Sequence, residues 1–280
     1  MRVLRLVLRV GPTSGPYNQL TLPALDRFET TVCTFYPHHF DSDWQPDLRL
    51  NYVQGDGSTK SFIGNIRRLL QGAEFDVIHV HSPHIGPLLF AAAMPRVLSV
   101  ARRTVMTLHS SYSVYRKRNR FLLWPSFFMG GKLVCCGNAS MASVPGWLQI
   151  AGGRRLSSIA NGVDLDRIDR ARHDERRPMD DRFDLVSVGA LRDLKNHAAV
   201  IHSLARIKRP DITLTIIGGG PGLGRLKDEA ARLGVITQIQ FAGPLPRDET
   251  LDRLWRADAF ISLSKGEGLP IAVLEAMACG

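Results

Sequence analysis

Cysteines and long apolar runs are scarce in this chain, and their scarcity excludes several classes of protein. The 280 residues include four cysteines, and no two of them form a CxxC pair. This usage favours buried thiols in a reducing compartment over a disulfide scaffold or a metal site. No segment reaches the roughly 18 consecutive apolar residues that a membrane-spanning helix needs. Arginines interrupt the first ten residues, which therefore predict a β-strand and not a signal peptide. We expect a cytoplasmic location.

Acidic residues are also outnumbered, because 36 Lys and Arg face 26 Asp and Glu, giving a net charge of +10. This excess favours an anionic partner: nucleic acid, phospholipid or a phosphorylated substrate. No nucleic-acid recognition motif accompanies it, so we expect no nucleic-acid partner. The clearest basic run, Arg116–Arg120, precedes the aromatic stretch Phe121–Phe128. Its pattern favours a core helix with a basic start. The alternative is a peripheral contact with anionic membrane at the inner face.

Short apolar runs alternate with amphipathic stretches along the first half of the chain. This alternation predicts a parallel sheet covered by helices on both faces. The amphipathic stretches include Lys60–Leu70 and Leu88–Ala101. The predicted strands are Leu4–Val10, Val32–Tyr36, Val77–Val80, Thr104–Leu108, Lys132–Cys135 and Ser157–Ile159.

A charged segment with almost no core residues, Asp166–Arg182, predicts an interdomain connection. The expected domains are therefore residues 1–165 and 183–280, joined by a linker at 166–182. The second alternation stops at Gly280, where a parallel sheet would continue, so we expect an incomplete second domain. Its predicted strands are Phe183–Val188, Ile212–Ile217, Ile239–Ala242 and Ala259–Leu263, and its predicted helices are Asn196–Ile207, Gly222–Leu233, Thr250–Ala257 and Ile271–Ala278.

The segment Ser264–Gly280 carries the strongest functional signal. Two doubly wound domains place a cleft between the carboxyl ends of their strands, where ligands bind. Glu267 follows the last predicted strand, and Glu275 lies eight positions later, within the last helix. The turn between them opens a helix, whose N–H groups and partial positive charge favour a phosphate. The two carboxylates can then accept hydrogen bonds from sugar hydroxyls.

This segment closely resembles the E-x7-E motif of glycosyltransferase family 4, and its Gly-Glu-Gly-Leu-Pro and Glu-Ala-Met-Ala-Cys-Gly sequences agree as well. The resemblance implies a GT-B fold, an α/β architecture of two Rossmann-like domains facing a cleft. It also implies that Glu267 faces the donor sugar and that Glu275 holds the ribose. The turn residues Gly266, Gly268 and Leu269 would contact the nucleotide-sugar.

Other segments extend the resemblance to both halves. Ser187–His197 matches the segment that ends in a phosphate-gripping lysine, here Lys195. Many relatives have arginine where this chain has Ala190, and nearby Arg192 is the candidate replacement. The glycine turn after strand Ile212–Ile217 places Gly218 near the nucleotide. Gly15, in the glycine loop after the first strand, is the matching candidate for a diphosphate contact.

Histidines follow two strands of the first half. Phe75–His81 resembles the family's D-h-h-H-h-H strand, where h is apolar, and Thr107–Ser110 resembles the next strand end. This resemblance places His109 near the reacting sugar. His79 and His81 lack a third ligand of suitable spacing, so a metal pair is disfavoured.

The resemblance implies retaining transfer of a hexosyl-type sugar, by front-face attack, from a UDP-, GDP- or ADP-sugar to a glycan or lipid acceptor. We expect a role in cell-envelope polysaccharide biosynthesis. Glu267, His109 and Lys195 are the catalytic candidates. No D-x-D metal motif appears where one would serve, so we expect no cofactor and no metal. Two alternatives remain: a nucleotide-sugar 2-epimerase of related fold, and a degenerate or truncated, non-catalytic relative.

Overall fold

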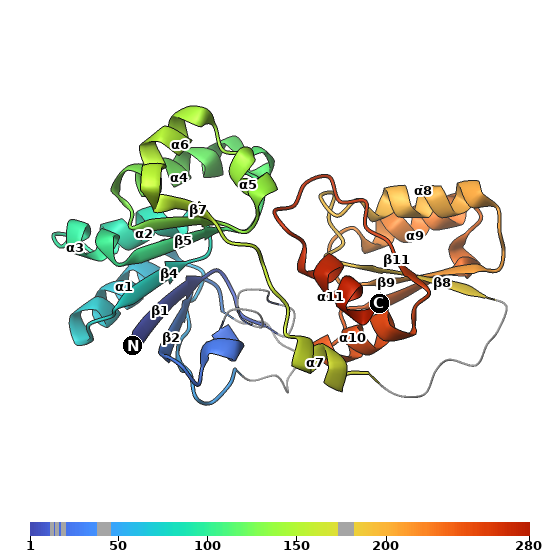
Figure 1. The fold of residues 1–280 in the computed structure, drawn as a ribbon, viewed down its shortest axis with the longest axis horizontal. Helices are drawn as coiled ribbons and strands as arrows, with labels where there is room; N and C mark the ends of the chain where they lie inside the picture. The colour runs from blue at the N-terminus through green and yellow to red at the C-terminus, as the bar shows by residue number, and fades with distance from the viewer. Residues whose placement is uncertain (12–13, 15–16, 18–20, 38–45, 173–181) are drawn as a thin grey trace. The chain divides into compact units, whose positions relative to one another are not determined.

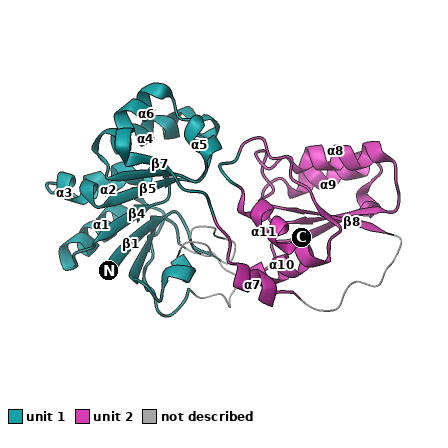
Figure 2. Ribbon diagram, viewed as in Figure 1, with its two compact units in different colours: residues 1–161, 267–269 teal, residues 162–266, 270–280 magenta. Residues whose placement is uncertain are grey.

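The computed structural model describes residues 1–11, 14, 17, 21–37, 46–172 and 182–280 (Figure 1). Gly15, a candidate site residue, lies outside these ranges. The chain divides into two compact units, which are coloured in Figure 2. Unit 1 comprises Met1–Asn161 and Glu267–Leu269, and unit 2 comprises Gly162–Gly266 and Pro270–Gly280.

Unit 1 is built on a seven-stranded sheet of order β3-β2-β1-β4-β5-β6-β7. Every described pairing in it is parallel. Parallel strands are buried on both faces, which explains why most of them are short apolar runs. The strands are β1 (Arg2–Val7), β2 (Glu29–Thr34), β3 (Asn51–Val53), β4 (Val77–Val80), β5 (Thr104–Leu108), β6 (Lys132–Cys135) and β7 (Leu156–Ser158).

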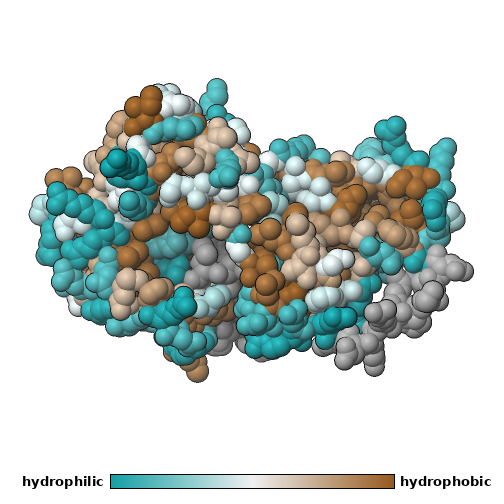
Figure 3. Space-filling model, in the orientation of Figure 1, coloured by the Kyte–Doolittle hydropathy of each residue, from teal (hydrophilic) through white to brown (hydrophobic). Residues whose placement is uncertain are grey.

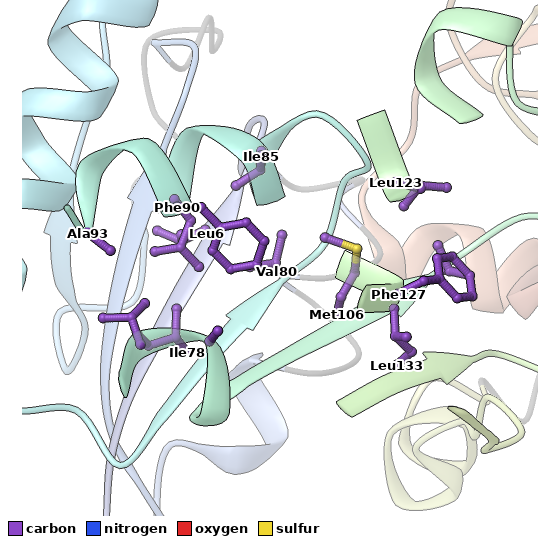
Figure 4. Close-up of a cluster of buried hydrophobic side chains, with 14 of the residues drawn as sticks. Leu6, Ile78, Val80, Ile85, Phe90, Ala93, Met106, Leu123, Phe127 and Leu133 are labelled. Carbon is purple, nitrogen blue, oxygen red and sulfur yellow. The ribbon is translucent and has the colours of Figure 1, made fainter. Parts of the chain in front are cut away.

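Four helices of unit 1 contact one another in series and bury a continuous core against the sheet. They are α1 (Thr59–Gly72), α2 (Ile85–Ala92), α4 (Lys117–Met129) and α6 (Gly146–Gly152). Figure 4 shows part of this core, in which Phe127 of α4 lies beside Leu133 of β6. The shorter helices are η2 (Leu22–Ala24), α3 (Val97–Arg102), η3 (Tyr112–Val114), α5 (Asn138–Ala142) and η4 (Gly153–Arg155).

Unit 2 contains a four-stranded parallel sheet of order β10-β9-β8-β11. Its strands are β8 (Phe183–Val188), β9 (Ile212–Ile217), β10 (Ile239–Gly243) and β11 (Ala259–Phe260). Helices α8 (His197–Ile207) and α9 (Leu223–Arg232) share one core cluster with it. A second cluster joins α7 (Leu165–Arg170), α10 (Arg247–Arg256) and α11 (Ile271–Cys279), and η5 (Ile236–Gln238) precedes β10. Two separate clusters around one parallel sheet are the arrangement expected of a doubly wound unit.

The predicted linker is wrong in its first part. Residues 166–170 belong to α7, and the unit boundary falls between Asn161 and Gly162 instead of at 165/166. Ile168 is buried, and the Trp255 indole donates a hydrogen bond to its carbonyl at 2.9 Å. A helix that buries so few side chains offers little hydrophobic periodicity, and so its sequence resembles a linker. Residues 173–181 lie outside the described part of the chain.

Two other predictions also need correction. The stretch Leu88–Ala101 forms two helices, α2 and α3, with Pro95 between them. Proline has no N–H to donate, and it disfavours helical conformation in the residue before it. The predicted strand Ala259–Leu263 is a strand only over Ala259–Phe260. In the described part of the chain, no helix is both long and apolar enough to cross a bilayer.

Candidate functional site

The loops at the carboxyl ends of β8, β9 and β10 are tied together by backbone hydrogen bonds in unit 2. Leu191 N donates to Gly219 O at 2.9 Å, and Gly222 N donates to Leu191 O at 3.0 Å. Gly218 N donates to Gly243 O at 2.8 Å, and the φ of Gly218 is +143°. A Cβ at Gly218 would overlap the carbonyl oxygen of Gly189. The glycine turn is therefore required where the loop after β9 packs against the loop after β8.

Lys195 stands at the end of the loop that follows β8. Its side chain lies along Gly189, since a Cβ there would come within 3.1 Å of its Cδ and Cε. The next residue, Asn196, caps α8 in the left-handed conformation, with φ at 55°. Asn is one of the few residues other than glycine that readily adopts this conformation. The turn thus fixes the backbone from which Lys195 extends.

The side chain of His197 contacts the same loop, the one that follows β8. This buried side chain has Nε2 at 3.3 Å from Gly189 O and Nδ1 at 3.3 Å from Ser187 Oγ. A carbonyl only accepts, so Nε2 carries the proton and Nδ1 accepts from the hydroxyl. Burial lowers the pKa of His197 and favours this neutral form. His197 therefore supports the turn under Lys195, a role that sequence reasoning missed.

The loop after β11 is joined directly to the Lys195 turn. Lys265 N donates to Leu194 O at 2.8 Å, and Asn196 Nδ2 donates to Leu263 O at 3.0 Å. These two hydrogen bonds bring the start of the Glu267 motif, including Gly266, beside the lysine loop. Unit 2 therefore brings together two segments that are about 70 residues apart in sequence.

Glu275 is buried on α11, with 2% of its surface exposed, and forms an ion pair with Arg247 at the start of α10. Burial lowers the pKa of Arg247 to about 10, so the guanidinium remains charged at neutral pH. The ion pair between Glu275 and Arg247 is therefore buried, whereas a lone glutamate on a helix would be expected to make a surface ion pair. Sequence reasoning missed Arg247. The one available signal was its position just after a strand end.

Arg192 occupies different surroundings from Lys195. It is exposed and lines a cavity of about 180 Å³ near the starts of α8 and α9, together with Arg225 and Lys265. Asp193 and Arg225 form an ion pair at this cavity. The cavity has a lining of mixed charge, because Glu229 lies there as well as Asp193, and Lys195 does not line it. The two predicted phosphate contacts therefore belong to different parts of the loop.

The central residues of the motif, Glu267–Leu269, group with unit 1. Ser111 Oγ donates to Glu267 O at 2.9 Å, and Asn161 Nδ2 donates to Leu269 O at 2.7 Å. A Cβ at Gly268 would overlap the Cys136 sulfur and approach the His109 carbonyl oxygen at 3.1 Å. Only glycine fits at position 268 without displacing these atoms.

His109 follows β5 and belongs to a buried histidine cluster. Its Nε2 lies 3.0 Å from Nδ1 of His81, and burial lowers the pKa of His109 to about 4. His79 Nδ1 lies 3.2 Å from the Arg5 guanidinium, and its Nε2 lies 2.8 Å from Thr107 Oγ1. Arginine only donates, so His79 accepts through Nδ1 and donates from Nε2.

The tautomers of His81 and His109 are coupled. His81 is buried, and burial lowers its pKa, as do the nearby His79, His109 and Arg5. Its Nε2 has no hydrogen-bond partner among the described residues. The proton between His81 Nδ1 and His109 Nε2 must come from one ring or the other. The cluster therefore presents neutral imidazoles at physiological pH. In the described residues, no group of three His, Cys, Asp or Glu is arranged for a metal ion.

Sequence comparison assigns both halves of the chain. Residues 28–167 match the profile of Glycosyltransferase Family 4, and residues 169–280 match Glycosyl transferases group 1. The chain belongs to glycosyltransferase family 4. The first match covers half of the chain, and four of the residues that carried the resemblance, His109, Lys195, Glu267 and Glu275, lie within the two matched ranges.

Family 4 relatives share moderate identity with this member. The Bacillus subtilis (strain 168) protein named "Putative glycosyltransferase EpsF" is 25% identical over 248 residues, which are 83% of this chain and 63% of EpsF. The GDP-mannose-dependent alpha-(1-6)-phosphatidylinositol monomannoside mannosyltransferase of Mycolicibacterium smegmatis is 36% identical over 139 residues, 45% of this chain and 36% of that enzyme. The chain thus spans less than two thirds of the length of these relatives.

Solved structures of this family's fold superpose on the whole chain. Anabaena Alr3699/HepE in complex with UDP and glucose aligns with a TM-score of 0.77 and 18% identity, covering 100% of this chain and 78% of that one. Sucrose-phosphate synthase from Thermosynechococcus elongatus aligns with a TM-score of 0.79 and 16% identity, covering 100% and 80%. At these identities the likeness concerns the fold, and it confirms the predicted GT-B architecture.

Proposed function

We propose that this family 4 protein transfers a hexosyl-type sugar, with retention, from a nucleoside-diphosphate sugar to a glycan or lipid acceptor. One observation carries the proposal. The Lys195 turn and the start of the Glu267 motif are hydrogen-bonded to each other at the carboxyl edge of the unit 2 sheet, through Lys265 N and Leu194 O at 2.8 Å. That edge is where doubly wound sheets bind their ligands. A lysine there supplies a point charge for a diphosphate.

In the proposed reaction, negative charge accumulates on the departing diphosphate as the bond to the sugar breaks. Lys195 and the backbone N–H groups at the start of α11 stabilise that charge. Glu267 orients the donor sugar. Glu275, whose carboxylate pairs with Arg247, holds the ribose. The acceptor attacks the same face that the diphosphate leaves, and no metal takes part.

His109 acts in this proposal as a neutral hydrogen-bonding group. Its pKa of about 4 leaves the imidazole uncharged at neutral pH, so it hydrogen-bonds a sugar hydroxyl without contributing a full charge. The partner His81 fixes which nitrogen of His109 is free, because the 3.0 Å hydrogen bond occupies Nε2. We therefore assign the contact with the sugar to Nδ1.

The relatives support the substrate classes. The mycobacterial relative is named for GDP-mannose and a phosphatidylinositol mannoside, and the Anabaena structure contains UDP and glucose. These names support a nucleotide-sugar donor and a lipid or glycan acceptor. A cytoplasmic location and a role in cell-envelope polysaccharide synthesis accord with such substrates and complete the proposal.

The test starts from a thermal-shift screen of UDP-, GDP- and ADP-sugars. A donor at about 100 times its dissociation constant stabilises the folded state by about 2.7 kcal/mol and raises the melting midpoint. Lys195→Ala should abolish the shift and lower kcat/KM for transfer by about 100- to 1,000-fold, the usual loss for one charge-stabilising donor. Arg206→Ala is the matched control, and we expect less than about a threefold effect because that exposed side chain lies in the last turn of α8, at the other end of the helix from the Lys195 turn.

Two results would reject the proposal. The first is equal donor binding by wild type and Lys195→Ala. The second is conversion of the donor to an epimer in the absence of any acceptor, which would assign the protein to the 2-epimerase class.

A further inference from the structure

Helix α4 of unit 1 has two apolar faces, and only one of them packs into the core. Leu123 and Phe127 are buried against the sheet. Phe121, Trp124 and Phe128 are 62%, 37% and 59% exposed. These three positions follow the spacing of one helical face, on the side opposite the core. The favoured interpretation of this sequence, a core helix with a basic start, therefore describes only half of its surface.

Helix α6 extends the exposed face of α4. Its Trp147 and Ile150 are 48% and 84% exposed. The Trp124 ring lies 5.0 Å from Phe121 and 5.1 Å from Trp147, measured between ring centroids. Apolar side chains are visible at the top of unit 1 in Figure 3, where α6 and α4 lie. We call Phe121, Trp124, Phe128, Trp147 and Ile150 the α4–α6 face.

The segment of chain that carries the α4–α6 face has charge of a single sign. Residues 77–163 contain no Asp or Glu and ten Lys or Arg. Arg116, Lys117 and Arg118 are exposed at the start of α4, and no ion pair joins them to another described residue. Nearby Arg120 and Arg155 are engaged with backbone carbonyl oxygens, so they serve the fold instead.

We propose that the α4–α6 face docks on an anionic phospholipid surface. Exposed Trp and Phe beside a cationic cluster form the pattern of peripheral membrane binding, in which rings enter the headgroup region and cations meet lipid phosphates. The charge argues against a second copy of the chain. A two-fold contact would place the positive charge of Arg116, Lys117 and Arg118 from both copies at one interface, and the segment that carries the face supplies no acidic residue to offset it.

Vesicle co-sedimentation tests this docking directly and requires no catalytic activity. Wild type should bind vesicles of mixed phosphatidylcholine and phosphatidylglycerol and dissociate from them at high salt. It should not bind vesicles of pure phosphatidylcholine. The triple variant Arg116→Gln, Lys117→Gln and Arg118→Gln should bind about 100-fold more weakly, because each cation contributes about fivefold near an anionic surface. Its matched control removes the same charge from Arg27, Lys60 and Arg68, which are exposed elsewhere on unit 1, and should keep wild-type binding.

A second variant tests the apolar component. Phe121→Ser with Ile150→Ser should lower vesicle binding at least tenfold and reduce the blue shift of tryptophan fluorescence on adding vesicles. Both side chains are exposed, so circular dichroism should show an unchanged fold. Glycosyl transfer to a soluble acceptor without vesicles should be the same in all variants, which separates failure of docking from failure of the proposed activity.

Three outcomes would overturn the proposal. Equal binding to neutral and anionic vesicles is one, and an equal loss of binding in the Arg27, Lys60 and Arg68 control is another. The third is a wild type that does not bind vesicles but forms a concentration-dependent dimer, or binds a single-stranded oligonucleotide, with the Phe121→Ser and Ile150→Ser variant losing that interaction.

Discussion

Removing Arg247 should leave one of the most buried charges of unit 2 without its cationic partner. Glu275 is 2% exposed, and the Arg247 guanidinium that pairs with it retains 18% of its side-chain exposure. A buried carboxylate cannot recover its hydration when the partner is cut away. Breaking such a pair costs about 3–5 kcal/mol. For a unit of about a hundred residues, this cost lowers the melting midpoint by roughly 10–20 °C.

The assay is thermal and urea unfolding of Arg247→Ala, followed by tryptophan fluorescence. Trp255 lies in unit 2 and hydrogen-bonds to Ile168 O at 2.9 Å, so the part of the fluorescence change that Trp255 contributes reports on that unit, whereas Trp124 and Trp147 report on unit 1. Arg256→Ala is the matched control on the same helix. Arg256 pairs with Asp252 one turn away at 3.0 Å, at a partly exposed site. We expect its loss to cost no more than about 0.5 kcal/mol.

A double-mutant cycle completes the test. Replacing both charges, as Arg247→Leu with Glu275→Leu, should recover at least about 2 kcal/mol relative to the sum of the single variants, because neither charge is then left unpaired. Additive losses, or an Arg247→Ala variant as stable as Arg256→Ala, would refute the reasoning. The recovered double variant should still fail to bind donor if Glu275 holds the ribose, which separates the two roles of this carboxylate.

Three further predictions concern other parts of the chain. Gly218→Ala should destabilise unit 2 by at least about 2 kcal/mol in urea unfolding, because its Cβ would overlap a carbonyl oxygen, whereas Gly224→Ala, in α9 with open space around it, should stabilise by up to about 1 kcal/mol. Burial lowers the pKa of His79 to about 3 and of His109 to about 4, below the unfolded value of 6.5. The unfolded chain therefore takes up these protons first, so the unfolding free energy should fall as pH drops from 6.5 to 4, measured by denaturant titration, and a flat profile would contradict it. Arg155→Ala should cost unit 1 about 2–3 kcal/mol by calorimetry, because Arg155 donates to carbonyls of Gly130 and Ala151 at 2.7 and 2.8 Å.

The sheets were predictable because buried parallel strands are marked in sequence. Val77–Val80, Thr104–Leu108 and Ile212–Ile217 have the predicted bounds. Each is an almost uninterrupted run of apolar or β-branched residues, which is the signal that burial on both faces produces. β3 (Asn51–Val53) was not predicted. It pairs on one side only, at the edge of its sheet, and is too short to show a pattern.

Partners across the tertiary structure were not predictable from sequence. Glu275 was identified from a motif, yet the identity of its partner depends on how α10 and α11 pack, and no local pattern in the sequence encodes that contact. The same holds for His197, whose role in the Lys195 turn depends on one acceptor, Gly189 O, and one hydroxyl donor, that of Ser187 in β8. A sequence motif identifies the residues that contact a ligand more readily than it identifies the residues that hold them in place.

The motif glycines show why residue identity alone does not fix a role. Gly218 and Gly268 were both assigned to the nucleotide-sugar, but at each one the missing Cβ makes room for atoms of the protein itself, the Gly189 carbonyl and the Cys136 sulfur. Packing is therefore a sufficient reason for glycine at either position. At Lys195 the part of the side chain that lies against Gly189 is its aliphatic stem. Lys195→Met keeps that stem and removes the charge, so under the proposed function it should lose donor binding, and a Lys195→Met variant that still binds donor would contradict the proposed role of the charge.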